Sequence, residues 1–432
     1  MKTTIAVLDK KVGNAKLILY DKQRCLHSGN AAVVFDGRIY SPTLGASGAE
    51  TIAKKLEQAD GIGASEAFLK QVEGDFSFFI VEPERIIAGR DPVGVQPLYY
   101  GENGSVAALA SNRRALWKLG VDVVRSFPPG HLTLVSRNGF KFKPVKTLVY
   151  AQPKSVAMRE AAETLQKLLE RSVCMRVWGV QEVAVAFSGG LDSSVVAFLA
   201  EKCCADVRLI HVSLENQAET EAAKKAADEL NLPLQIFLFR ESDVANVVDR
   251  VVELIEEPDP IKTSIGVPFY WMAEKAAETG FKVLLAGQGA DELFGGYQRY
   301  VNEYLLHGKD AARKTMFDDI VRVHESNLER DVKICGFHDV ELRLPFAWYQ
   351  LAEFALALPT ELKIERDEGS LRKLVLRKAA ENMGLPVSIA EKPKKAIQYS
   401  TGINHVLKKL AKKQGTTVAE YVNSFFRQKT GC

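Results

Sequence analysis

One stretch of the sequence combines residue types that suit a phosphate. The apolar run 184–187 leads directly into Ser188-Gly189-Gly190, and Leu191-Asp192-Ser193-Ser194 follows. Two glycines let the main chain turn tightly and bring its N–H groups close to an anion. A helix starting near Ser193 would add its positive N-terminal end, the serines would add hydroxyl donors, and Asp192 would add a carboxylate for a metal ion. The stretch predicts a phosphate cradle without a lysine.

Two other nucleotide-binding motifs do not occur in this sequence. No G-x-x-x-x-G-K-[ST] pattern is present, which excludes a Walker A loop. The nearest approaches to a dinucleotide fingerprint, at 61–66 and 287–292, both lack the third glycine. The alternative interpretation of 184–194 is an ordinary strand–turn–helix junction, where glycines and capping serines are common.

The elements that must position this stretch change character near residue 150. Before it, short apolar strands alternate with turn residues, which predicts antiparallel pairing because tight connections cannot join parallel neighbours. The expected strands are 3–8, 16–20, 31–35, 76–81, 85–88, 105–109 and 131–135, with helices near 50–58 and 113–119. We therefore expect a first domain over residues 1–150 and a second over 151–432.

The second domain alternates helices and strands. The expected order is helix 155–175, strand 182–187, helix 193–203, strand 207–213, helix 218–230, strand 234–239, helices 243–256 and 267–279, and strand 282–286. This rhythm predicts a mainly parallel sheet with helices on both faces, which binds ligands at the carboxyl ends of its strands. Beyond residue 297 we expect mostly helix.

Composition narrows the class of protein. The 432 residues contain 57 Lys and Arg against 54 Asp and Glu, a net charge of +3, which argues against a protein that coats nucleic acid. No stretch approaches the roughly 20 apolar residues that cross a bilayer, and the N-terminus lacks a signal peptide's apolar run. The six cysteines form no CxxC pair, so we expect reduced thiols and neither a zinc site nor a disulfide framework. These features predict a soluble cytoplasmic enzyme.

Several motifs together resemble a known family. The 188–194 stretch is similar to the PP-loop of the N-type ATP pyrophosphatases, which bind the pyrophosphate of ATP and form an adenylate. Motifs of the asparagine synthetases resemble four further segments, which occur in the same order along this chain: 90–100, 287–297, 340–346 and 392–395. The resemblance implies an α+β, Ntn-hydrolase-like first domain with antiparallel sheets, then an α/β PP-loop ATP pyrophosphatase domain with a parallel sheet and a helical C-terminal part.

The first domain departs from this family where glutamine would be hydrolysed. Lys2 stands where the family has its cysteine nucleophile, and the first cysteine, Cys25, lies well inside the domain. Asp36 replaces an asparagine that donates to an oxyanion, and an ionised carboxylate only accepts hydrogen bonds. We therefore expect no glutaminase activity, and we expect Arg90 and Asp91 to serve the structure.

The resemblance assigns roles in the second domain. It implies ATP as substrate and Mg²⁺ as cofactor, with Asp192 and Asp291 sharing one or two Mg²⁺ ions. Lys394, or the adjacent Lys395, would neutralise charge on the α-phosphate. The residues expected to bind ATP are Phe187, Ser188, Gly189, Gly190, Asp192, Ser193, Ser194, Val212, Ala286 and Gly287. Val212 has an equally weighted alternative, in which it is an inward-facing core residue of its strand and does not contact ATP.

A second departure concerns the amine. Gln288 replaces the family's glutamate, and an amide can orient ammonia but cannot remove its proton. Glu341 is the expected nearby base instead.

The predicted function is an amide-forming ligase. It would adenylate a carboxylate, with aspartate as the first candidate, and release pyrophosphate, and ammonia would then attack the adenylate to form the amide. Alternatives are another carboxylate, ammonia from a separate glutaminase subunit, attack by the substrate's own amine in a cyclisation, or a non-catalytic nucleotide-binding relative. The expected partners are the small-molecule substrates, with a glutaminase subunit or a homodimer left open, and neither nucleic acid nor membrane.

Overall fold

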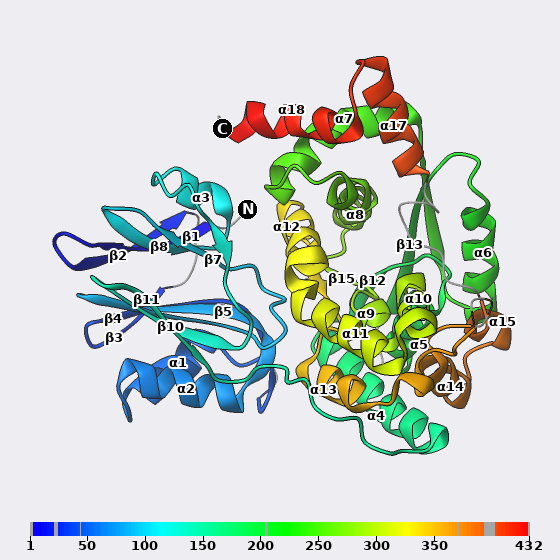
Figure 1. The fold of residues 1–432 in the computed structure, drawn as a ribbon, viewed down its shortest axis with the longest axis horizontal. Helices are drawn as coiled ribbons and strands as arrows, with labels where there is room; N and C mark the ends of the chain where they lie inside the picture. The colour runs from blue at the N-terminus through cyan, green and yellow to red at the C-terminus, as the bar shows by residue number, and fades with distance from the viewer. Residues whose placement is uncertain are drawn as a thin grey trace. The chain divides into compact units, whose positions relative to one another are not determined.

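The chain divides into two compact units, Met1–Leu148 and Val149–Cys432. Figure 1 traces them in a computed structural model, coloured from the blue N-terminal unit to the red C-terminal helices. The structure describes residues 3–20, 25–43, 45–203, 206–367, 369, 371–392 and 402–430. Each unit is treated separately below.

The N-terminal unit contains two antiparallel sheets. The first runs in the order β2 (Asn14–Tyr20), β1 (Thr3–Asp9), β8 (Val106–Ala110), β7 (Tyr99–Glu102) and β9 (Arg125–Ser126). The second runs in the order β11 (Gly139–Pro144), β10 (His131–Ser136), β6 (Arg85–Arg90), β5 (Glu73–Glu82), β4 (Ala31–Ser41) and β3 (Cys25–Ser28). Every pairing within them is antiparallel, as expected from the short connections.

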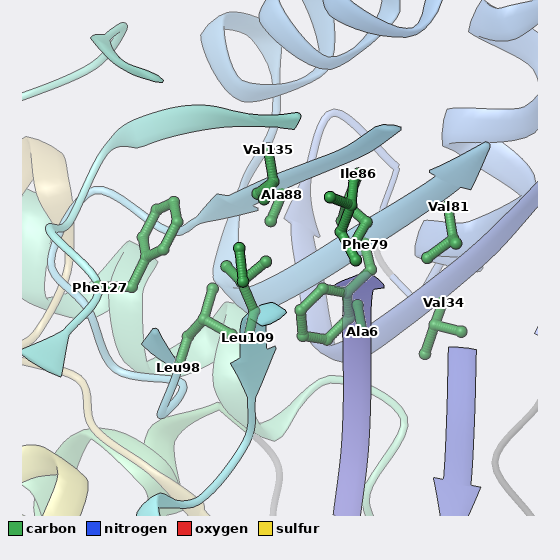
Figure 2. Close-up of a cluster of buried hydrophobic side chains, with 12 residues drawn as sticks. Ala6, Val34, Phe79, Val81, Ile86, Ala88, Leu98, Leu109, Phe127 and Val135 are labelled. Carbon is green, nitrogen blue, oxygen red and sulfur yellow. The ribbon is translucent and has the colours of Figure 1, made fainter. Parts of the chain in front are cut away.

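The two sheets pack face to face, and helices cover their outer faces. Side chains of alternate residues in a strand point to opposite faces, so Phe79 of β5 lies between the sheets while Phe78 lies under the helices. Figure 2 shows the apolar layer between the sheets, to which Ala6, Leu109 and Val135 contribute. The helices α1 (Gly48–Leu56) and α2 (Gly61–Gln71) cover the second sheet, and α3 (Arg113–Trp117) covers the first. The expected α+β class is confirmed.

The second unit is built on a parallel sheet. Its order is β14 (Leu234–Phe239), β13 (Asp206–Leu214), β12 (Glu182–Ala186), β15 (Val283–Leu285) and β16 (Glu341–Arg343), and all neighbours are parallel. The chain adds β13 and β14 on one side of β12 and then crosses to add β15 on the other. Such a switch point leaves a crevice at the carboxyl ends of the strands, where ligands bind in this class of sheet. The expected α/β class is confirmed.

Helices fill the rest of the second unit. The helix α6 (Ala218–Leu230) ends at Asn231 in the left-handed conformation, and α8 (Pro260–Glu278) begins at Asp259, which caps it, and a proline in its first turn. The others are α4 (Met158–Val177), α5 (Leu191–Lys202), α7 (Glu241–Ile255), α9 (Ala290–Phe294), α10 (Gln298–His307), α11 (Lys309–Val323), a π-helical turn (His324–Leu328), α12 (Glu329–Phe337), α13 (Tyr349–Ala357), α14 (Leu374–Met383), α15 (Val387–Ala390), α17 (Ile403–Lys413) and α18 (Val418–Thr430). None of the helices in the described ranges is long and apolar enough to cross a membrane.

The expectation of a mostly helical chain beyond residue 297 is confirmed, although β16 returns to the sheet there and pairs with β15. One expectation about the second unit was wrong. The thiols are not all reduced, because Cys174 of α4 and Cys203 after α5 form a disulfide with their Cα atoms 5.2 Å apart. The two cysteines are 29 residues apart and meet only when α4 packs on α5, so their sequence spacing gave no sign of the bond.

Candidate active site

A pocket of about 770 Å³ opens at the carboxyl ends of the parallel strands. Most of the residues expected to bind ATP, metal or amine line it: Phe187, Ser188, Asp192, Ser193, Val212, Ala286, Gly287, Gln288 and Asp291. Gly189, Gly190 and Ser194 belong to the same loop but are not among the lining residues. The pocket therefore brings together segments that lie about 100 residues apart in sequence, as the switch point of the sheet requires.

The loop after β12 is held in shape by its own hydroxyls. The Ser193 Oγ accepts from the Ser188 main-chain N–H at 3.3 Å and lies 3.2 Å from the Ser188 Oγ, which in turn accepts from Gly190 N–H at 3.3 Å. No side chain of the described residues caps the first turn of α5, which begins beside this loop. A helix N-terminus with uncapped N–H groups favours an anion.

Gly189 and Lys392 fix the outer side of this loop. Gly189 has a φ of +63°, and a Cβ there would lie 2.8 Å from the Cα of Ala223 in α6, so a larger residue would be strained and would clash. The Lys392 ammonium donates to the Gly189 carbonyl at 2.8 Å. A cation thus stands next to the loop, although the sequence motif itself contains none.

Asp192 and Asp291 share a single cation. The Lys373 Nζ lies 2.6 Å from both carboxylate oxygens of Asp192 and 2.6 Å from Oδ1 of Asp291. Lys373 is only 2% exposed and adopts a φ of +62°. The glycine at position 296 leaves room for the Lys373 side chain to reach Asp291. A Cβ there would lie 1.9 Å from Asp291 Oδ1 and 2.5 Å from Lys373 Cε. The two expected metal ligands therefore lie on either side of one positive charge.

This arrangement suits a divalent cation. Carboxylate oxygens are the protein donors that Mg²⁺ prefers, and Mg²⁺ usually takes one or two of them together with phosphate oxygens. The Lys373 ammonium already occupies a position between the two carboxylates, so the donor set attracts positive charge. Asp192 and Asp291 are the residues that would hold the ion.

The opposite end of the pocket is apolar. Phe187 and Val212 line it from the sheet, and Ile265, Phe269 and Met272 line it from α8. His211, next to Val212, is buried, and its ring nitrogens lie 2.9 Å from the Phe187 carbonyl and 3.3 Å from the Thr220 hydroxyl. Burial lowers the pKa of His211, which favours the neutral ring, and the two contacts link β13 to the loop after β12 and to α6. A planar base fits such an apolar end.

Gln288 is oriented by a buried ion pair. Its Nε2 donates to Asp331 Oδ2 at 2.6 Å, and Asp331 is paired with Arg330 at 2.7 and 3.0 Å. Burial raises the pKa of Asp331, against the stabilising effect of Arg330 and Gln288 on the carboxylate. The Gln288 amide nitrogen thus donates to Asp331, and the Gln288 side-chain oxygen is left to accept a hydrogen bond.

Glu292 is an acidic residue of the pocket that the sequence analysis did not select. It is 4% exposed, and its Oε1 accepts from the Tyr297 hydroxyl at 2.7 Å and from Asn327 Nδ2 at 2.8 Å. Asn327 reaches it from the π-helical turn between α11 and α12. Such turns insert one residue into a helix and often occur at functional sites.

Not all expected residues come together. Glu341 lies at the amino end of β16, forms an ion pair with Arg343 at 2.8 Å and is not among the pocket-lining residues, so the structure does not bring it to Gln288. Lys394 and Lys395 lie outside the described residues. Lys373 and Glu292 were missed because their roles depend on neighbours distant in sequence. The only signal for Glu292 was its place directly after Asp291 in a family-like motif.

The N-terminal unit uses its motif residues differently. The Asp91 carboxylate accepts main-chain N–H groups of the turn that follows it, at 3.1 Å from Val93 and 2.7 Å from Gly94. Arg90 donates to the carbonyls of Gly94, Gln96 and Phe127. Both side chains are buried, and all of these bonds shape the main chain.

Two family models match the sequence. The asparagine synthase model matches residues 164–308 and 303–429, and the glutamine amidotransferase domain model matches residues 17–118. The first of these spans more than half of the chain.

Known proteins resemble the chain to different degrees. A protein of Methanocaldococcus jannaschii, provisionally named as glutamine-hydrolysing asparagine synthetase 1, is 34% identical over 81% of this chain and 73% of its own length. The glutamine-hydrolysing asparagine synthetase 2 of Lotus japonicus is 29% identical over 79% of this chain and 60% of its own length. The chain thus spans about 60 to 73% of these relatives.

Likeness to a solved structure is weak. NMN synthetase from Francisella tularensis superposes with a TM-score of 0.30 at 13% identity, over 64% of this chain and 94% of that one, and no inference rests on it. The family model and the M. jannaschii relative are sufficient: this chain belongs to the asparagine synthase family, a family of ATP-dependent amidation.

Proposed function

We propose that this chain is an AMP-forming ligase that adenylates a carboxylate, with aspartate as the first candidate, and then forms an amide with ammonia. The observation that carries the proposal is the arrangement of Asp192, Asp291 and Lys373 beside the Ser188–Ser194 loop. Two carboxylates and a lysine at the end of a serine- and glycine-rich loop suit the polyphosphate of a nucleotide.

The roles follow from the positions of the side chains. The N–H groups and hydroxyls of the loop would bind the β- and γ-phosphates, which leave as pyrophosphate. Mg²⁺, held by Asp192 and Asp291, would supply neutralisation of phosphate charge. Lys373 would then offer its ammonium to the same oxygens. Lys394 or Lys395 is the further proposed lysine at the α-phosphate. The apolar end beside Phe187 and Val212 would hold the adenine.

The second half-reaction is aminolysis of the adenylate. The Gln288 oxygen can accept a hydrogen bond from ammonia and so orient its lone pair towards the carbonyl, while Asp331 fixes the amide. Gln288 cannot remove the proton that the nitrogen then carries. We assign that step to Glu292, because it lines the pocket, whereas Glu341 does not. Tyr297 and Asn327 hold the Glu292 carboxylate in place.

We infer that the chain has no glutaminase activity of its own. An activated cysteine needs a lowered pKa, but partial burial raises the pKa of Cys25, which lies on the strand β3. Asp36 lies in mid-strand on β4, where its main chain pairs with Ser77. Free ammonia, or ammonia from a separate glutaminase subunit, would then be the nitrogen source.

Gln288 also favours a second candidate function. A site whose family glutamate is an amide can accept a nitrogen nucleophile that arrives as part of the substrate, which would give a lactam or another cyclic product. Both candidate functions begin with adenylation of a carboxylate. They differ in the nitrogen that attacks the adenylate, which is ammonia in the first and an amine of the substrate itself in the second.

Exchange of labelled pyrophosphate into ATP tests the adenylation step. We expect exchange that depends on Mg²⁺ and on a carboxylate, together with AMP as the product when ammonium is added. Glutamine as the only nitrogen donor should give no turnover. Release of ADP would contradict the proposed chemistry, and turnover with glutamine as efficient as with ammonium would contradict the absence of glutaminase activity.

A further inference from the structure

The guanidinium of Arg377 joins two segments that carry lysines. Arg377 lies near the start of α14 and is 6% exposed. Its Nε donates to the Arg372 carbonyl at 2.5 Å, its Nη1 donates to the Ala390 carbonyl, and its Nη2 donates to the Lys392 carbonyl at 3.1 Å. In the described part of the chain, no carboxylate accepts a hydrogen bond from it. All three of its side-chain nitrogens are thus committed to main-chain oxygens.

The first of these segments carries Lys373. The Arg377 side chain holds the carbonyl of Arg372, and the Arg377 main-chain N–H donates to the carbonyl of Lys373 at 2.9 Å. These carbonyls belong to the two peptide groups that flank the Lys373 Cα, so together they fix both of its main-chain torsions. Lys373 has a φ of +62°, which a residue with a Cβ rarely adopts without support from its surroundings. The main-chain bond forms whatever the side chain is, but the bond to Arg372 depends on the guanidinium.

The second segment leads to Lys392. The Arg377 guanidinium holds the carbonyl of Ala390, the last residue of α15, and that of Lys392 itself. From there the Lys392 ammonium reaches the Gly189 carbonyl of the phosphate loop at 2.8 Å. One guanidinium therefore anchors the main chain of two lysines, one of which contacts the carboxylate pair and the other the loop.

Arg377 can influence a ligand of the pocket only indirectly. It is not among the residues that line the pocket, whereas both carboxylates that Lys373 contacts are. Burial lowers the pKa of Arg377, and the negative charge of Asp192 opposes that effect. The ordinary pKa of arginine lies so far above neutrality that the guanidinium keeps its charge. Arg377 is therefore a permanently charged anchor outside the pocket.

We propose that Arg377 is a positioning residue for adenylation, which places the ammonium groups of Lys373 and Lys392 at the carboxylate pair and at the phosphate loop, respectively. A planar guanidinium offers donors in fixed directions, whereas a single ammonium on a flexible chain does not hold two segments at once. This inference rests on the proposed adenylation, and it adds the residue through which the two lysines depend on each other. The competing interpretation is that Arg377 stabilises the packing of α14 and α15 without any effect on the reaction.

The conservative variant Arg377→Lys tests the proposal. Pyrophosphate exchange is measured with the full chain and with the carboxylate that supports the highest wild-type rate. We expect kcat to fall by about 30- to 100-fold, because a misplacement of about 1 Å can cost that much. The KM for ATP should rise, because the displaced lysines belong to the phosphate side, while the KM for the carboxylate should stay within about twofold of the wild type. A role in packing alone would lower stability and leave the kcat of the folded enzyme unchanged.

Arg176→Lys is the matched control. Arg176 is a fully buried arginine of α4 in the same unit, it donates to the main-chain carbonyls of Ser172 and Ala347, and it does not line the pocket. We expect both lysine variants to unfold at a lower temperature than the wild type, because each loses donors to buried carbonyls. The folded fraction of Arg176→Lys should nevertheless keep the wild-type kcat and both KM values.

A double-mutant cycle shows whether Arg377 acts through Lys373. Lys373→Met removes the ammonium that Arg377 is proposed to place. In that background, adding Arg377→Lys should lower kcat by no more than about 10-fold, because only the contribution through Lys392 remains to be lost. A double variant whose kcat equals the product of the two separate losses would show independent effects and would overturn the inference.

The outcomes separate this inference from the proposed function. Absence of carboxylate-dependent exchange in the wild type would contradict the proposed function itself. Normal wild-type exchange together with an unchanged kcat in Arg377→Lys, or with an equal loss in Arg176→Lys, would overturn only the positioning role. If Arg377→Lys does not fold, Arg377→Gln, which keeps an amide donor for one carbonyl, undergoes the same measurements with the same expected results.

Discussion

The two units bury charged motif residues for opposite purposes. In the N-terminal unit, Arg90 and Asp91 bond mostly to main-chain groups, those of the turn that follows them and the Phe127 carbonyl. In the second unit, Asp192, Asp291 and Lys373 come from three distant segments. Lys373 contacts both carboxylates, and both carboxylates line a pocket. A buried charge that is satisfied by its own turn stabilises the fold. Charges assembled from separate segments at a pocket are the arrangement that the proposed binding of a nucleotide requires.

The largest effect should come from the second unit's carboxylates. Asp192→Asn should reduce pyrophosphate exchange by about 1000-fold or more, because it removes a metal ligand and leaves Lys373 with one acidic partner. Thermal unfolding with and without Mg²⁺ and ATP should show that the variant folds but no longer gains stability from the nucleotide. Asp206→Asn, at the amino end of β13, is the control and should retain activity. Pyrophosphate exchange at the wild-type rate by Asp192→Asn would contradict the proposal that the charges of the second unit serve a ligand.

The equivalent change in the N-terminal unit should affect stability instead. Asp91→Asn should lower the free energy of unfolding by about 3 kcal/mol, because Asp91 is 1% exposed and accepts several main-chain N–H groups. Urea unfolding measures the loss, and pyrophosphate exchange by the folded fraction should be normal. Asp9→Asn, which neutralises a turn carboxylate that is only partly buried, should have a much smaller effect. Loss of ATP binding in Asp91→Asn would mean that this unit also serves the site.

The disulfide offers a perturbation that is confined to the second unit. Cys203→Ser should lower its stability by about 2 to 3 kcal/mol, because the bond closes a 29-residue separation between α4 and the end of α5. Hydrogen–deuterium exchange should increase in α4 and α5 and stay unchanged in β5. Cys25→Ser, which removes a free thiol of the other unit, is the control. Equal exchange in α4 and α5 with and without the bond would show that packing alone holds these helices.

The smallest effect concerns acid. Burial lowers the pKa of His338 to about 4 from an ordinary 6.5, so the unfolded chain takes up a proton that the folded chain does not. Stability contributed by the neutral ring is present above pH 6.5 and is lost as the pH falls from 6.5 towards 4. The ring is partly exposed, so we expect only about 1 kcal/mol. Urea unfolding at pH 7.5 and 5 should show a smaller pH dependence for His338→Gln than for the wild type. An identical dependence would assign the acid sensitivity to other groups.

Local patterns predicted much of the fold, and distant contacts limited the rest. The helix 218–230 and the strand 234–239 have the expected boundaries, because hydrophobic periodicity and turn residues are local signals. The loop 188–194 was recognisable for the same reason. The strand β16 is three residues long, and its partner β15 lies more than 50 residues earlier, so nothing nearby indicated it.

The candidate site divides in the same way. Asp192 and Asp291 follow strands that end at one edge of the sheet, so their proximity could be expected. Lys373 could not be found from its surroundings, because Leu371-Arg372-Lys373 has the composition of an ordinary exposed segment, although Lys373 is buried. Glu341 was misplaced because its position relative to the pocket depends on where β16 begins, and the side chain lies at the amino end of that strand.

The order of synthesis has a bearing on Lys373. It comes 181 residues after Asp192, so a growing chain carries both acidic groups of the cluster long before their lysine emerges from the ribosome. A chain that ends before residue 373 lacks the positive charge that Asp192 and Asp291 share in the finished protein. We therefore expect the proposed polyphosphate site to form only when the last 60 residues of the chain, 373–432, have begun to emerge.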